Sequence, residues 1–98
     1  MNDFTADEAK ALQAERGIYM EIRADGHVRS IQPGKAPADG ARVVVVKGAG
    51  TVHEAKSEIR LAQAAGKLSD KQLERLEDDQ PQAAGELRRA LRRVREIE

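Results

Sequence analysis

The sequence predicts an α+β fold in one small domain: a helix, a three-stranded and mainly antiparallel sheet, and then three helices. Two observations predict this class. After residue 17 apolar residues alternate with a period of two, whereas after residue 50 they recur every three or four positions. Strands that precede a run of helices favour a sheet with the helices segregated from it. The 98 residues fit one domain and are too few for two separate cores.

The first expected element is a helix over residues 6–16. Thr5 and Glu8 have the spacing of a capping box, and Gly17 supplies a left-handed stop. In residues 18–23, which follow directly, every second residue is isoleucine or methionine. This alternation predicts a strand with one buried face.

A hairpin turn of three residues is expected to end this strand, with Gly26 at the position that needs a positive φ. The return strand then covers residues 27–32. The turn sets two cross-strand pairs, one of opposite charges and one of apolar side chains, which are Glu21 with Arg29 and Ile22 with Val28.

The next segment is a loop followed by a strand. Residues 33–41 contain two prolines and two glycines, which indicates a turn-rich loop. Residues 43–46 are four consecutive valines. An unbroken β-branched run favours burial on both faces, so we expect a central strand with helices on both sides of it.

Thr51 and Glu54 form a second capping box, which opens a helix expected over residues 52–65 with Gly66 as its stop. Apolar residues at helical spacing form its inward stripe: Val52, Ala55, Ile59 and Ala62.

Two further helices are expected. Ser69 and Gln72 form a third capping box before a short helix over residues 70–77, and Pro81 suits the first turn of a last helix over residues 81–98, about 27 Å long. The short helix has two inward residues, Leu73 and Leu76. The last helix carries a longer apolar stripe, which consists of Leu87, Ala90, Leu91, Val94 and Ile97.

Three strands offer limited area for four helices to cover. The alternative arrangement is therefore an open sheet whose C-terminal helix docks on a second chain. Leu91 lies in the middle of that helix's stripe. We expect its apolar contacts to be completed partly by a second copy or by a target protein, because long isolated helices are marginal in water.

Composition excludes several classes of protein. Lys and Arg number 17, as do Asp and Glu, so the chain has no global electrostatic preference for nucleic acid or acidic membranes. The absence of cysteine removes disulfides, thiol nucleophiles and zinc–thiolate sites. The first ten residues are polar and acidic, unlike a signal peptide, and the valine run is too short to span a bilayer. We expect a cytoplasmic protein that does not bind membranes.

The segment between the third strand and the following helix resembles half of a phosphate-binding loop. Lys47, Gly48, Gly50 and Thr51 lie where exposed N–H groups at a helix start can hold an anion. However, His53 stands where the dinucleotide pattern needs a third glycine or alanine. The favoured interpretation is a tight strand-to-helix connection, and a small-anion or nucleotide sensor is the minor alternative.

No catalytic constellation is recognisable. His27 and His53 are the only histidines, and His53-Glu54 lacks the second histidine of a zinc protease motif. No serine is placed as a nucleophile beside either of them. We therefore expect a protein that is not an enzyme and needs no metal and no cofactor.

The most distinctive segment is the expected last helix, because arginines flank its apolar stripe: Arg88, Arg89, Arg92, Arg93 and Arg95. Residues 80–98 hold five basic and three acidic residues, a net charge of +2, whereas residues 51–79 hold five basic and seven acidic residues, a net charge of −2. These arginines and Leu91 are the predicted partner-binding residues. They could contact phosphates, carboxylates of another protein or the acidic helices of a second copy, or they could be the solvated face of a core helix.

The leading hypothesis is a small non-enzymatic regulator or inhibitor that binds another protein and forms a homodimer. Small, charge-dense chains without cysteine are common among phage and mobile-element proteins of this kind, which makes a viral protein one possible origin. The alternative hypothesis is a nucleic-acid-binding regulator whose arginine helix contacts phosphates.

Overall fold

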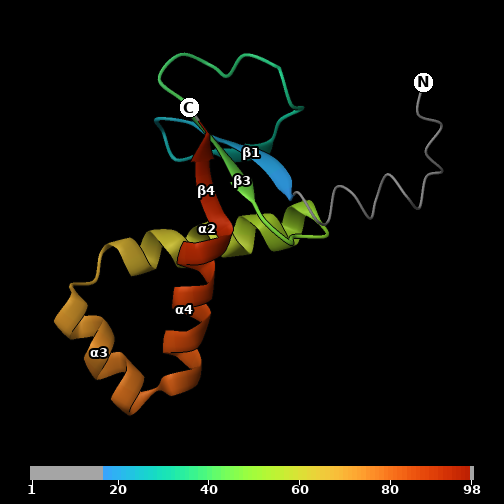
Figure 1. The fold of residues 1–98 in the computed structure, drawn as a ribbon. Coiled ribbons are helices and arrows are strands. Elements are labelled where there is room, and N and C mark those ends of the chain that lie inside the picture. Colours follow the sequence, from blue (N-terminus) through green and yellow to red (C-terminus); the bar gives the residue numbers. More distant parts are fainter. Residues whose placement is uncertain (1–16, 98) are drawn as a thin grey trace.

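The computed structural model describes residues 17–97, and the helix expected over residues 6–16 lies outside them. The described chain has the predicted α+β class, with four strands and three helices (Figure 1). In chain order these are β1 (Ile18–Ile22), β2 (Val28–Ser30), β3 (Arg42–Val46), α2 (Val52–Gly66), α3 (Asp70–Asp79), α4 (Pro81–Arg93) and β4 (Val94–Ile97).

The four strands form one antiparallel sheet in the order β2-β1-β3-β4. The hairpin between β1 and β2 has the predicted register, with Glu21 opposite Arg29 and Ile22 opposite Val28. Gly26 adopts the expected positive φ of 92°. The return strand is shorter than residues 27–32, because pairing with β1 extends only over three residues.

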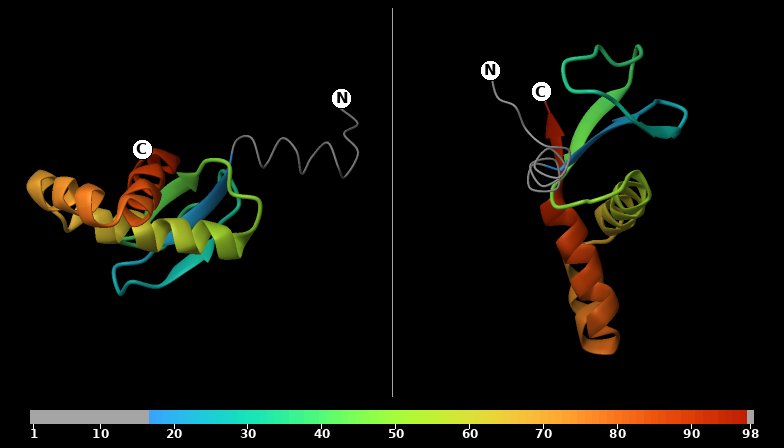
Figure 2. Two further views of the ribbon diagram at one scale, coloured as in Figure 1. Left: turned by 90° about the horizontal axis from the view of Figure 1, so that it is seen from below. Right: turned by 90° about the vertical axis from the view of Figure 1, so that its right-hand side faces the viewer.

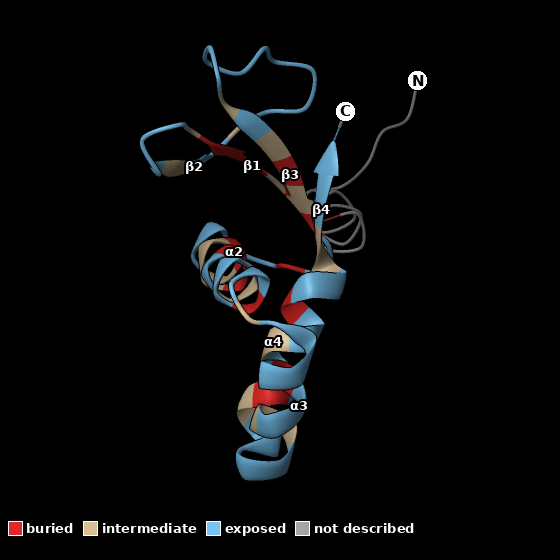
Figure 3. Cartoon of the chain, turned by 90° about the vertical axis from the view of Figure 1, so that its left-hand side faces the viewer, coloured by how far each residue is buried: buried red, intermediate tan, exposed pale blue. Residues whose placement is uncertain are grey.

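The valine strand β3 lies inside the sheet between β1 and β4, as predicted. Burial on both faces by helices was also expected, and this is wrong for the described residues. Val44 and Val46 are buried beneath α2, whereas Val43 and Val45 on the other face are only half-buried. Among residues 17–97 the helix packed across the sheet is α2, and it covers one face (Figure 3).

The hydrophobic core lies between α2 and this face of the sheet. Side chains on one face alternate along each strand, so β1 and β3 direct their buried apolar residues to the same side. The core consists of Ile18, Met20, Ile22, Val44, Val46, Ala49, Ala55 and Ile59, with Val28 and Val94 packed against it.

Helix α2 begins at the predicted residue but without the full capping box, because the Glu54 carboxylate accepts from the Gly50 N–H instead of the Thr51 N–H, and it ends differently. The Thr51 hydroxyl accepts a hydrogen bond from the Glu54 N–H, which confirms the N-cap. Gly66 was expected to be a left-handed stop, but it belongs to the helix and has no positive φ. The Lys67 N–H closes the last turn on the carbonyls of Ala64 and Ala65 in a right-handed conformation, so no left-handed residue is needed.

Helices α3 and α4 form an antiparallel pair that extends away from the sheet (Figure 2). Ser69 and Gln72 make the predicted capping box, and Pro81 occupies the predicted first turn of α4. Helix α3 continues two residues past the expected end at residue 77. Leu73 of α3 and Ala84 of α4 are buried.

The single helix expected over residues 81–98 is wrong. Helix α4 ends at Arg93, and Val94–Ile97 turns into β4, which pairs with β3 from Val46 opposite Val94 to Val43 opposite Ile97. The strand supplies hydrogen-bond partners for the edge of β3, which a continued helix would leave without them. The expected stripe is therefore divided between a helix and a strand.

Candidate protein-binding surface

Arg93, one of the five predicted partner-binding arginines, is held inside the fold. Its side chain is 20% exposed. Its Nε donates to the Lys47 carbonyl at 2.7 Å, and its two terminal nitrogens contact Glu54 Oε1 at 3.0 Å and Glu58 Oε1 at 3.3 Å. Arg93 therefore joins the end of α4 to the β3–α2 loop and to α2.

Glu58 is a buried carboxylate that the sequence analysis did not identify. It is 4% exposed, and Oε1 is also 3.5 Å from Arg89 Nη2. Its other oxygen, Oε2, has no hydrogen-bond partner among the described residues. The sequence pattern does indicate this burial, because Glu58 follows Ala55 by three residues and therefore lies beside the apolar stripe of α2. Its contacts with Arg89 and Arg93 place it toward α4.

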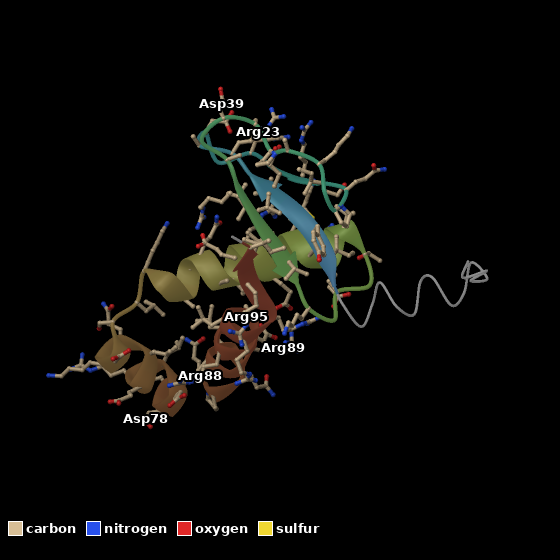
Figure 4. All side chains as sticks on the ribbon, turned by 45° about the horizontal axis from the view of Figure 1, so that its top comes forward. Arg23, Asp39, Asp78, Arg88, Arg89 and Arg95 are labelled. Carbon is tan, nitrogen blue, oxygen red and sulfur yellow. The ribbon has the colours of Figure 1, made fainter. Side chains whose placement is uncertain are left out.

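Arg88 is also paired within the chain, because its Nε donates to Glu77 of α3. Arg88, Arg89 and Arg93 thus all contact carboxylates of α2 or α3, and they connect α4 to its neighbours. Figure 4 shows Arg88 and Arg89 on α4 and Arg95 on the strand that follows it. Three of the seven acidic residues in the segment 51–79 therefore pair with these arginines inside the molecule: Glu54, Glu58 and Glu77.

Three of the six predicted residues are exposed and contact no carboxylate within residues 17–97, and we call them the C-terminal surface: Leu91, Arg92 and Arg95. Leu91 is 45% exposed, although it lies in the apolar stripe of α4. Arg92 is exposed and forms no ion pair within residues 17–97. Arg95 is exposed and donates only to the Arg92 carbonyl, at 3.1 Å. An exposed apolar side chain is therefore followed in the chain by two arginines that form no ion pair within residues 17–97.

The residues considered for anion binding lie together in the β3–α2 loop: Lys47, Gly48, Gly50 and Thr51. However, the Glu54 carboxylate already binds a backbone N–H of this loop. The Gly50 N–H donates to Glu54 Oε2 at 3.2 Å. This backbone donor first, and then the Arg93 guanidinium, lower the pKa of Glu54 below its ordinary value. Gly48 has a positive φ of 77°, and a Cβ there would lie 3.1 Å from Arg93 Nη2. The contacts favour the interpretation of a tight connection, held by Glu54 and Arg93.

A second buried carboxylate, Glu21, lies on the sheet face opposite α2. It is fully buried and accepts hydrogen bonds from Arg29 Nε at 2.8 Å, Arg23 Nε at 3.0 Å and the Ala38 N–H at 2.8 Å. The Ala38 N–H, Arg23 and Arg29 together lower the pKa of Glu21 from 4.5 to about 2. Its pairing with Arg29 was predicted, but its burial was not. Glu21 fastens the loop of residues 31–41 to the sheet.

Comparisons with protein-family models, with curated proteins and with solved structures find no match for this chain. Within the described residues, no helix is long and apolar enough to cross a membrane. His27 and His53 are both exposed and lie on separate segments, a hairpin turn and the first turn of α2.

Proposed function

We propose that this protein is a small non-enzymatic regulator or inhibitor that binds another protein through its C-terminal surface. The observation that carries the proposal is the 45% exposure of Leu91 at the end of a helix where Arg88, Arg89 and Arg93 pair within the chain and Arg92 does not. An exposed aliphatic side chain at a protein surface becomes a binding anchor when a partner offers an apolar pocket.

The two arginines indicate the chemistry of that partner. A guanidinium without an intramolecular carboxylate can form paired N–H···O bonds with a carboxylate of another protein. Arg92 and Arg95 lie close to Leu91 in the chain, one next to it and one four residues on. The surface therefore fits an apolar pocket bordered by aspartate or glutamate side chains.

The same contacts weaken the support for a nucleic-acid-binding regulator. Phosphate binding gains affinity from each free basic group, since each one releases counterions. Three of the five arginines named for that role contact carboxylates of α2 or α3. Two remain, on a chain of zero net charge.

The proposal is tested by affinity capture with the full chain from the cells in which it occurs, followed by mass spectrometry. We expect one protein in stoichiometric amount, lost with Leu91→Asp and reduced with Arg92→Glu. Arg75→Glu is the matched control, because Arg75 is an exposed arginine of α3 that forms no ion pair within residues 17–97. Recovery of nucleic acid without a stoichiometric protein would contradict the proposal.

A further inference from the structure

Among residues 17–97, strand β4 is an edge of the sheet, and no described strand pairs with its outer side. The Lys47 N–H donates to the Arg93 carbonyl at 2.8 Å. This bond shows which residues of β4 turn their backbone N–H and C=O groups toward β3. In an antiparallel pair, alternate residues turn their N–H and C=O groups toward the partner strand. Arg95 and Ile97 therefore turn these groups toward β3, and Glu96 turns its own away from the sheet.

Hollows lie on both faces of the sheet beside this edge. On the face away from α2, a hollow of about 440 Å³ is lined in part by Tyr19, Ile31, Val43 and Ile97. On the α2 side, a hollow of about 600 Å³ is lined in part by Ile22, Val44, Ile59 and Val94. Both hollows reach Arg42 and Glu96, which form an ion pair between β3 and β4.

We propose that β4 binds an extended segment of a partner protein as a fifth, antiparallel strand of the sheet. A strand added at an edge gains affinity from main-chain hydrogen bonds and specificity from pockets that take alternate side chains. The outward N–H and C=O groups of Glu96 can form the main-chain hydrogen bonds, and the hollows on either face can take the alternate side chains. This inference rests on the proposed function and states the form in which the partner is bound.

The side chains of β4 define which segment fits. An antiparallel segment meets Ile97, Glu96, Arg95 and Val94 in that order, and directly opposite residues share a face. Apolar residues fit opposite Ile97 and Val94, where they enter the two hollows. A basic residue fits opposite Glu96, whose exposed carboxylate also pairs with Arg42, and an acidic residue fits opposite Arg95. The partner segment therefore has the pattern apolar, basic, acidic, apolar.

A second copy of this chain does not fit the edge. Two identical edges that pair in one sheet are related by a two-fold axis perpendicular to it, so the register is centred on a single residue. A register centred on Arg95 places Arg95 opposite its own copy, and one centred on Glu96 does the same for that glutamate. Like charges directly opposite are destabilising. In the registers centred on Arg95 and on Glu96, the sequence of β4 thus opposes self-pairing and favours a different strand.

The test uses a fluorescently labelled twelve-residue peptide with the central sequence Val-Lys-Glu-Val, and anisotropy measures its binding to the full chain. Glu96→Pro removes the outward N–H without removing a bond to β3, which is the position an edge strand tolerates for proline. Glu96→Ala is the matched control, because it removes the same carboxylate and keeps the N–H. A peptide with the central charges reversed, Val-Glu-Lys-Val, controls for composition.

We expect Glu96→Pro to weaken binding roughly tenfold, since one main-chain hydrogen bond is lost and the ring blocks approach. Glu96→Ala should cost about two- to fivefold, the size of one cross-strand charge pair. The reversed-charge peptide should cost more than Glu96→Ala, because it places like charges opposite both Glu96 and Arg95. Equal binding to Glu96→Pro and Glu96→Ala, or no binding of the peptide to the wild type, overturns the inference. Self-association of the wild type that Glu96→Pro abolishes also overturns it, because a second copy then occupies the edge.

The capture experiment separates this inference from the proposed function. If Leu91→Asp loses the protein partner and Glu96→Pro retains it, strand addition fails and the proposed function stands. If both variants retain the partner, the proposed function fails as well. Loss with both variants supports both.

Discussion

Glu21 shows how one buried side chain makes the fold depend on pH. It is fully buried among two arginines and the Ala38 N–H, and these groups favour the charged carboxylate. Its pKa is therefore lowered from 4.5 to about 2. A lowered pKa in the folded state contributes stability that is present above the unfolded pKa and lost as the pH falls toward the folded one.

We predict that the part of the free energy of unfolding contributed by Glu21 is constant above about pH 5.5 and falls between pH 4.5 and about 2. Urea denaturation of wild type and Glu21→Gln across this range measures it. The difference between the two proteins should shrink as the pH falls through the window. Glu74→Gln, at an exposed position of α3, is the control. A difference that does not change with pH would contradict the prediction.

Arg93 is the arginine whose loss should cost the fold most. We predict that Arg93→Ala lowers the free energy of unfolding by about 3 kcal/mol, because the buried Glu58 carboxylate loses its nearest charge partner. Arg92→Ala should change it by less than about 0.5 kcal/mol, as an exposed surface substitution does. Chemical denaturation checks both. If Glu58→Met added to Arg93→Ala restores no stability, the buried charge is not the cause.

Among the helices and strands, the largest difference from the sequence-based expectation is β4, which replaces the end of the expected last helix. We predict that Arg95→Pro destabilises the protein by about 3 kcal/mol, because its N–H turns toward β3 and the ladder bond is lost. Glu96→Pro should cost much less, since its N–H turns outward. Urea denaturation of the two variants compares them. Equal costs would indicate that residues 94–97 form no strand against β3, as in the helix expected from the sequence.

Helix α4 combines a packing role with an exposed site. We predict that Leu91→Asp abolishes partner binding while changing the free energy of unfolding by less than about 1 kcal/mol, because Leu91 is 45% exposed. Leu73→Ala should cost about 2–4 kcal/mol, since Leu73 is buried in the α3–α4 pair. Circular dichroism and denaturation measure both. A Leu91→Asp protein that unfolds outright would place this side chain in the monomer core.

At the scale of the whole molecule, one helix covers one face of a four-stranded sheet, and α3 with α4 projects from it (Figures 2 and 3). The places with incomplete packing in the described chain include the C-terminal surface, the edge of β4 and the sheet face away from α2. The first two adjoin along the chain, because α4 passes directly into β4. The C-terminal surface and the edge of β4 are therefore within reach of a single partner. Variants at Leu91 and Glu96 test the two proposals in the same capture experiment.

The predictions that the structure confirms concern features whose hydrogen bonds join residues close together in the chain. These include the caps at Thr51 and Ser69, the start of α4 at Pro81 and the register of the Gly26 hairpin. Local chemistry suffices for these features, because turn and cap geometry is set by the residues that form it. The sequence also proposed Leu91, Arg92 and Arg95 as partner-binding residues, but it did not separate them from Arg88, Arg89 and Arg93.

The conformation of the C-terminal segment depends instead on contacts with residues far away in the chain. Residues 94–97 continue a helical stripe in the sequence, yet they become a strand because β3, about fifty residues earlier, offers an edge to pair with. The same holds for the arginines, which are alike in sequence but divided by their distance from Glu54, Glu58 and Glu77. Burial and pairing depend on contacts between segments far apart in the chain, and a local pattern does not contain them.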